Sequence, residues 1–539
     1  MNTQLPLEPS ATDAPVATLA FQDARSARDW LKLLPLINVP VAHAEIRSAI
    51  SALNHSQITA LDRLKIIEQF RETIHVVQDG WLNRYTQKAL PLTEIEHQAW
   101  QAALTLWQDL EQSYASIWQA AIAGQSDVAE YMTLLAERTL YYSLQVNIAY
   151  ILVHRVIPAT QWAQQFSHYS QAQHLGVEQQ KAKDSLMTIG GVATPEHIFI
   201  HSLLLSAANP FQYNLRYLTW ISACLEVFSS RCALEHIAET LPNRPAFTID
   251  FEHPAAPERR DRPSKDSQMA ISTLQLAQAL SKRIKLLRRG EMPEKIGLGT
   301  ALGVPAAEAL LTDLYRQWCE HPVERCLARR ASQKTAQIGF GLSNLHAWMA
   351  KDRFTPPPQA EAQISSEELM QIRLFGQTST PSQPAPLIRT LTWQVLDETA
   401  TGLRLQGPVG EERMALQQLL IIQDQQQYLM GQIRWLSEEN QQLKIGVQLL
   451  PGMPQAASIR AQDAARFGQT DYIDVLLLPA MVALKVPNSL LLPTGWFRQG
   501  RLLELWDGYR KIRIRLVSIL SRGADFERIH FVGSGGLDH

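Results

Sequence analysis

An arginine-rich segment at residues 325–334 carries side chains that could hold a phosphate group or a nucleobase. It contains one Arg-x-x-x-Arg spacing and one Arg-x-x-x-Lys spacing, formed by Arg325, Arg329, Arg330 and Lys334. A guanidinium group presents a planar fork of donors that fits phosphate oxygens or the O6 and N7 atoms of guanine, and it can also stack on a base. The segment therefore predicts an arm that binds an anion.

A second polar segment lies between the strand-forming runs LTWQVL and GLRL, and it contains Asp397, Thr399 and Gly402. A short carboxylate and a hydroxyl group in a turn can accept hydrogen bonds from exocyclic and backbone donors. The glycine lets the main chain approach a neighbour closely or adopt a positive φ. The same residue types are common in ordinary turns between strands, so the turn predicts a ligand site only in combination with the arm.

Together the two segments resemble the PilZ family of cyclic di-GMP receptors, in which a D/N-x-S-x-x-G turn faces an arginine arm. The likeness covers about residues 323–455, including GFGLSNLHAWMA and YLMGQIRWLSEENQQLKIGVQLLPG, as in a subset of these proteins with a long helical N-terminal region. The resemblance implies that cyclic di-GMP binds between arm and turn without any cofactor. It also implies a regulatory adaptor, not an enzyme, that signals to motility, attachment or exopolysaccharide machinery.

The chain departs from the family pattern at two points. Thr399 stands in place of serine, which keeps the hydroxyl group. In the arm, either Arg330 and Lys334 or Arg325 and Arg329 could occupy the two family positions. In the first alignment a lysine cannot form the bidentate fork, and in the second the pair lies further from the first strand. An alternative function is therefore a nucleotide-independent scaffold with a degenerate barrel.

Other candidate sites are weaker. His197 and His201 are spaced to share one helix face, but their order is not that of a zinc protease and no third ligand is apparent, so we expect no metal site. The tryptophans Trp100, Trp107 and Trp118 follow helical spacing and are expected to pack in a core, as Trp393 and Trp435 are in or on the barrel. No constellation typical of catalysis stands out.

Composition limits the classes of partner. A formal net charge of −2 gives no general field for a nucleic-acid backbone, so we expect no nucleic-acid partner. The four cysteines are sparse and typical of reduced thiols, the N-terminus lacks a secretory signal, and no uninterrupted apolar run is long enough to insert into a membrane. We therefore expect a cytoplasmic protein whose helical region binds one or more protein partners.

The hydrophobic spacing predicts an α+β multidomain protein, with an all-α N-terminal region followed by an all-β PilZ-like barrel region. A helix preceded by a Thr93-x-x-Glu96 capping box is the clearest helical element. The expected divisions are a flexible tail and lead-in (1–43), a helical domain (44–240), a linker (241–267), a helical connector (268–322), a PilZ-like barrel (323–455) with a Pro/Gln/Ser-rich insertion at 351–389, and further strands or a second small barrel (456–539).

Overall fold

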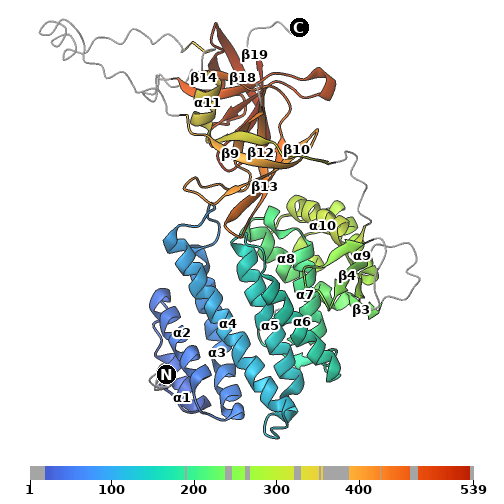
Figure 1. Ribbon diagram of the computed structural model, residues 1–539. Helices are drawn as coiled ribbons and strands as arrows, with labels where there is room; N and C mark the ends of the chain where they lie inside the picture. Colours follow the sequence, from blue (N-terminus) through green and yellow to red (C-terminus); the bar gives the residue numbers. More distant parts are fainter. Residues whose placement is uncertain are drawn as a thin grey trace, which may run out of the picture. The chain divides into compact units, whose positions relative to one another are not determined.

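The computed structural model describes residues 19–187, 191–236, 246–260, 268–320, 329–350, 354–355, 388–424, 427–461 and 472–533. The chain divides into two compact units. The helical unit comprises Met1–Lys88 and Leu92–Arg325, and the barrel unit comprises Ala89–Pro91 and Cys326–His539. Helices dominate the first and strands the second (Figure 1), which confirms the α+β multidomain class predicted from the sequence.

The helical unit contains ten α-helices within the described residues. They are α1 (Ala24–Lys32), α2 (Val39–His55), α3 (Ala60–Trp81), α4 (Glu94–Ile122), α5 (Met132–Leu152), α6 (Ala159–His174), α7 (Pro195–Ala207), α8 (Leu215–Phe228), α9 (Leu274–Arg288) and α10 (Val304–Cys319). Two short strands, β1 (Ala182–Lys183) and β2 (Val192–Ala193), form a small ribbon after α6.

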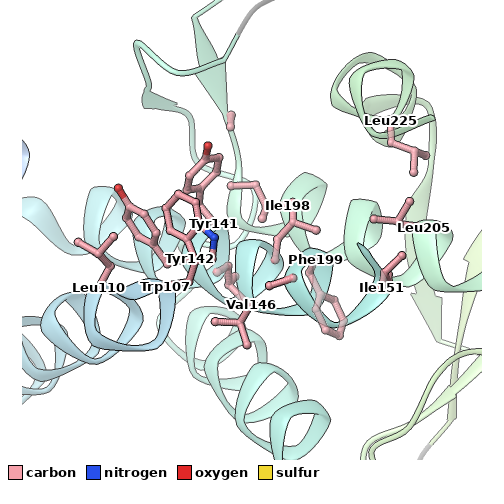
Figure 2. Packing of buried hydrophobic residues seen from close by; sticks show 14 of the residues in the cluster. Trp107, Leu110, Tyr141, Tyr142, Val146, Ile151, Ile198, Phe199, Leu205 and Leu225 are labelled. Carbon is pink, nitrogen blue, oxygen red and sulfur yellow. The ribbon is translucent and has the colours of Figure 1, made fainter. Parts of the chain in front are cut away.

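Helix α4 shows how local sequence sets these elements. Its capping box is present as predicted, because the Thr93 side chain accepts from the Glu96 backbone N–H and the Glu96 carboxylate accepts from the Thr93 backbone N–H. The apolar stripe of α4 packs against α5 and α3. Figure 2 shows Trp107 of α4 near Tyr141 and Tyr142 of α5, within one core that runs through to α7 and α8. The predicted packing role of Trp100, Trp107 and Trp118 is thus confirmed by their burial.

The lead-in expected to be flexible contains regular structure from residue 24 onward. Helix α1 begins after a capping box between Asp23 and Ser26. Phe21 packs its ring against Trp30 of α1 and Phe70 of α3, so this short helix is fixed by aromatic contacts with the core. Residues 1–18 lie outside the described residues. The lead-in was missed because nine mostly polar residues give little periodic signal.

A buried ion cluster lies in the core of the helical unit. The Arg71 guanidinium of α3 donates two hydrogen bonds of 2.9 Å to the two oxygens of Asp184, and their side chains are 3% and 0% exposed. Arg138 of α5 contacts Asp184 and Glu68. These contacts attach the segment that follows β1 to α3 and α5.

The segments expected to be a linker and a helical connector belong to the helical unit. A four-stranded sheet has the order β3-β6-β4-β5, with β3 (Ala233–His236), β4 (Ala246–Asp250), β5 (Glu258–Arg260) and β6 (Gln268–Ser272). Strands β4 and β5 fall within 241–267, where we expected only a linker. Helices α9 and α10 share the main core, and the Trp318 indole donates to the Leu204 carbonyl at 3.0 Å.

The first barrel of the barrel unit is formed by β8 (Thr335–Phe340), β9 (Leu391–Thr399), β10 (Gly402–Pro408), β11 (Leu419–Asp424), β12 (Gln427–Glu439) and β13 (Gln442–Leu449). Antiparallel pairing runs β10-β13-β12-β11-β8-β9, and β9 pairs with β10 to close the barrel. The short β7 (Arg330–Ala331) extends the sheet beside β9. Most of the insertion expected at 351–389 lies outside the described residues.

The second barrel is closed as well, in the order β14-β15-β16-β19-β18-β17. Its strands are β14 (Gln455–Ala461), β15 (Ile473–Leu478), β16 (Ser489–Leu492), β17 (Leu502–Trp506), β18 (Lys511–Arg522) and β19 (Glu527–Gly533). Helix α11 (Leu342–Ala350) joins a core shared by both barrels, because Leu345 and Trp348 pack with residues of β11, β12, β15 and β16. The barrels therefore form one packed unit.

The segment Ala89–Pro91 is remote in sequence from the rest of the barrel unit. Leu90 and Met414 exchange two backbone hydrogen bonds of 2.7 Å, and the Arg413 guanidinium donates to the Ala89 and Pro91 carbonyls. Leu90 and Met414 are both buried, at 1% exposure.

None of the helices in the described part of the chain is long and apolar enough to cross a membrane.

Candidate functional site

The predicted turn joins β9 to β10, and a β-bulge decides how its aspartate is placed. Asp397 lies opposite Arg404, whereas Val395 lies opposite Leu405, so Leu396 has no partner in β10. A bulge of this kind inserts one residue and changes the face on which the following side chains lie. Val395 and Leu405 are buried in the barrel, while Asp397 forms an ion pair with the half-exposed Arg404 at 2.6 Å. The carboxylate of Asp397 thus lies on the outer surface of the barrel.

Thr399 and Gly402 hold the turn together. The Thr399 hydroxyl donates to the Gly402 carbonyl at 3.2 Å and accepts from the Thr401 backbone N–H at 3.3 Å. A Cβ atom at position 402 would lie 2.7 Å from the carbonyl oxygen of Val447, which is closer than real Cβ atoms approach. Gly402 is therefore required by the close packing of β10 on β13. Its φ does not lie in the positive region that we had considered as the other reason for glycine.

The arginine arm runs along β9 up to this turn. Ala331 is the β-sheet partner of Asp397, and the Ser332 backbone N–H donates to the Leu396 carbonyl at 3.0 Å. These backbone contacts bring the Arg329 guanidinium to 3.3 Å from the Asp397 carboxylate. Arm and turn are thus in direct contact, as the sequence analysis expected of a shared site.

A surface pocket of about 300 Å³ lies at this contact. Four of the predicted residues line it: Arg329, Asp397, Thr399 and Gly402. Two other predicted residues lie outside its lining. Arg330 is exposed on β7, and the Lys334 ammonium forms an ion pair with Glu398 at 2.8 Å. Arg325 lies outside the described residues.

The further residues that line the pocket, which were not predicted from the sequence, include Arg404, Arg434 and Trp435. Arg404 reaches the pocket because it lies opposite Asp397 across the hairpin. In β12, Ile433 pairs with Val447 and Trp435 with Gly446, so a second bulge leaves Arg434 without a partner in β13. Arg434 is exposed and Trp435 is half-buried. The alternation in GLRLQG could have indicated an outward Arg404, but the bulge in β12 gives no comparable signal.

The charge of the pocket favours an anionic ligand. Three guanidinium groups, from Arg329, Arg404 and Arg434, line it, and among the described lining residues Asp397 supplies the one carboxylate. Asp397 is only 7% exposed and is held between Arg329 and Arg404. The formal charge of the lining is therefore positive, and the guanidinium groups can serve phosphate oxygens or base edges.

The histidine pair lies in the helical unit and is held by helix packing. His201 of α7 is buried, and its Nε2 lies 3.1 Å from the Ser222 hydroxyl of α8. Burial lowers the pKa of His201 to about 3 and also lowers the pKa of His197. The position of His201 is that of a core histidine satisfied by a serine.

Comparison with known protein families gives two matches. The family described as the N-terminal domain of the cyclic-di-GMP receptor FimW matches residues 25–240. The FimW C-terminal beta-barrel domain matches residues 458–533. The first match falls in the helical unit and the second on the second barrel, and the first barrel with its pocket lies between the two matched segments. No curated protein matches the chain.

Proposed function

The chain belongs to the family of the cyclic-di-GMP receptor FimW, a PilZ-like family with a helical N-terminal region, and from this premise we propose that it binds cyclic di-GMP in the pocket between the arm and the turn. The observation that carries the proposal is the direct contact between Arg329 and Asp397 in a pocket of positive formal charge. Receptors of this kind bind and regulate, so the proposed role is regulatory and not catalytic.

The chemistry of the pocket suits the two parts of the ligand. Cyclic di-GMP carries two phosphates, which match the guanidinium groups of Arg329 and Arg434. It also carries two guanines, whose N1–H and exocyclic amino groups can donate to the Asp397 carboxylate. The proposal favours the alignment in which Arg325 and Arg329 take the two family positions, because Arg329 lines the pocket while Arg330 and Lys334 do not.

Ligand binding would act by favouring one arrangement of the arm over another. In the free protein both Arg329 and Arg404 form ion pairs with Asp397. A ligand that binds these side chains replaces their contacts with Asp397. It can shift the arrangement of the arm only by the difference between its binding free energies for the two arrangements. We propose that the response passes, in the cytoplasm, to a protein partner that docks on the helical unit and belongs to motility, attachment or exopolysaccharide machinery.

Calorimetry with the full-length protein and cyclic di-GMP tests the proposal. Arg329→Ala should weaken binding by about 10- to 100-fold, the range expected for charge-assisted hydrogen bonds. Arg330→Ala is the matched control, because it removes an arginine one residue away on the same arm but outside the pocket lining. Absence of any binding at tens of micromolar ligand would leave the nucleotide-independent scaffold as the better function. A loss confined to Arg330→Ala would instead favour the other alignment.

A further inference from the structure

A groove with a cavity volume of about 390 Å³ runs along the helical unit and shares no residue with the pocket of the first barrel. Most of its described lining residues come from α3, α5 and α8. Its base reaches the main core, because the buried Trp107 and Tyr141, both labelled in Figure 2, line it. At 1.5 Å per residue, the lining stretches of α5 and α8 are each about 16 Å long, so the groove is elongated along these helices. The lining residues recur at helical spacing, and they include His75, Gln78 and Asp79 on α3, Tyr141, Gln145, Ile148 and Leu152 on α5, and Leu215, Leu218, Ser222 and Glu226 on α8.

The face of α5 that lines the groove is less covered than the rest of this helix. Every residue from Leu135 to Leu144 is buried, so all sides of α5 are covered over that stretch. Further along, Gln145, Ile148 and Leu152 share one face and line the groove, and they are only half-buried. A helix with apolar residues on all sides is typical of a position enclosed by neighbours. The groove therefore occupies the place of one more neighbour of α5.

The charge of the groove favours a basic occupant. Asp79 of α3 and Glu226 of α8 supply carboxylates, and the described lining residues include no lysine or arginine. Burial lowers the pKa of His75 to about 4, so this imidazole, whose Nε2 lies 2.7 Å from the Tyr141 hydroxyl, is neutral at neutral pH. The formal charge of the lining is therefore negative, opposite in sign to that of the pocket in the first barrel. Cationic side chains beside an apolar surface would complement both carboxylates.

The residues that α8 contributes leave room for the backbone of another helix. Thr219, Ser222 and Ala223 line the groove with short side chains, and Thr219 and Ala223 are exposed. Packed helix axes lie about 8–10 Å apart, at a separation set by the side chains at the contact. We propose that the groove binds an amphipathic helix of a partner protein, with apolar residues at i, i+3, i+4 and i+7 against α5 and basic residues beside Asp79 and Glu226. This inference rests on the proposed docking of a partner on the helical unit and names its site and its chemistry.

Two synthetic peptides of roughly 14 residues, about four helical turns, test the proposal by fluorescence anisotropy with the full-length protein. Both carry leucine on one helix face, and the flanking positions are lysine in one peptide and glutamate in the other. The lysine peptide should bind about 2- to 30-fold more tightly, the range for two solvent-accessible ion pairs. This difference should largely disappear when Asp79→Asn and Glu226→Gln are combined. The control Glu72→Gln removes an exposed carboxylate of α3 outside the lining and should keep the difference.

A bulky side chain in the groove should block the peptide. Thr219→Trp should weaken binding of the lysine peptide by about 5- to 150-fold, from the cost of inserting extra atoms into a packed contact. Val76→Trp adds the same side chain at an exposed position of α3 outside the lining, and it should bind like the wild type. Melting temperatures of both variants show whether a loss of affinity follows a loss of folding.

Three results would refute the groove as the docking site: equal affinity of the wild type for the two peptides, undiminished binding by Thr219→Trp, or no binding of either peptide. The last result is expected if a segment of the chain itself fills the groove. Calorimetry with cyclic di-GMP on the same proteins tests the proposed ligand site separately. Ligand binding without peptide binding would leave that site standing and remove the groove, and peptide binding without ligand binding would do the reverse.

Discussion

Replacing Asp397 by alanine separates the ligand site from the ordinary turn chemistry of the β9–β10 hairpin. In the free protein the Asp397 carboxylate contacts the guanidinium groups of Arg404, at 2.6 Å, and Arg329, at 3.3 Å. Both arginine side chains are about two-fifths exposed, at 41% and 38%. Ion pairs with partners so exposed contribute about 0–1 kcal/mol to stability. The melting temperature should therefore change by only a few degrees.

The loss of affinity should be larger than the loss of stability. Hydrogen bonds from guanine to a carboxylate are charge-assisted, and each contributes about 1.5–3 kcal/mol. The ligand must, however, replace at least one guanidinium group that already occupies Asp397. We therefore expect the lower end of that range, about 1.5 kcal/mol, which corresponds to roughly a tenfold increase in Kd.

Calorimetry on Asp397→Ala and Glu398→Ala measures this difference directly. Glu398 is the neighbouring carboxylate on β9, and it forms an ion pair of 2.8 Å with Lys334 outside the pocket lining. The two variants thus each remove one carboxylate from the same strand, but only Asp397→Ala should weaken binding. Equal losses in both variants, or none in Asp397→Ala, would refute the assignment of the site.

Two further predictions concern the structure around and beyond the pocket. Gly402→Ala should lower the free energy of unfolding by about 1–3 kcal/mol, because its Cβ would lie 2.7 Å from the Val447 carbonyl oxygen. Urea denaturation measures this loss, with Gly410→Ala as the control because a Cβ atom there would meet no atom within 4 Å. Equal stability of the two variants would contradict the prediction. Burial lowers the pKa of His201 from 6.5 to about 3, so between these values the unfolded chain binds a proton that the folded chain does not. Stability should therefore be lost as the pH falls below about 6.5, by up to about 1.4 kcal/mol per pH unit for this group. In urea denaturation experiments from neutral to acid pH, the free energy of unfolding of His201→Gln should fall less steeply with pH than that of the wild type. An equally steep fall in both proteins would show that His201 is not its source.

Local sequence patterns were sufficient to predict the elements that depend on residues close together in the chain. The capping box at Thr93 and Glu96 depends on residues three apart, and the strand–turn–strand setting of Asp397 depends on fewer than twenty. The fold class followed from such patterns, because helical periodicity dominates the N-terminal part of the chain and strand periodicity the C-terminal part. Contact between Arg329 and Asp397 came from the family resemblance, since nothing local links residues 68 positions apart.

The missed features depend on strand register and on long-range contacts. Arg404 lines the pocket beside Asp397 because the bulge in β9 places Asp397 opposite it, and Trp435 lies on the outer face because the bulge in β12 shifts its pairing by one residue. The pair Arg71 and Asp184 joins residues 113 positions apart, so no local spacing indicates it. Strand β4 lies in a segment whose proline and charge content favoured a linker, but β6 supplies its partner.

Because the segment Ala89–Pro91 pairs with the first barrel, the barrel unit is completed only after two distant parts of the chain have been synthesised. Arg413 and its acceptor Ala89 are 324 residues apart, so the barrel unit is not encoded by one continuous stretch of sequence. At about 5–20 residues per second, a ribosome makes Leu90 roughly 15–65 s before Met414. During that interval the backbone groups of Leu90 cannot have the partners they have in the finished protein. A fragment that begins at Cys326 would lack them permanently, and it would leave Met414 without its two backbone hydrogen bonds to Leu90.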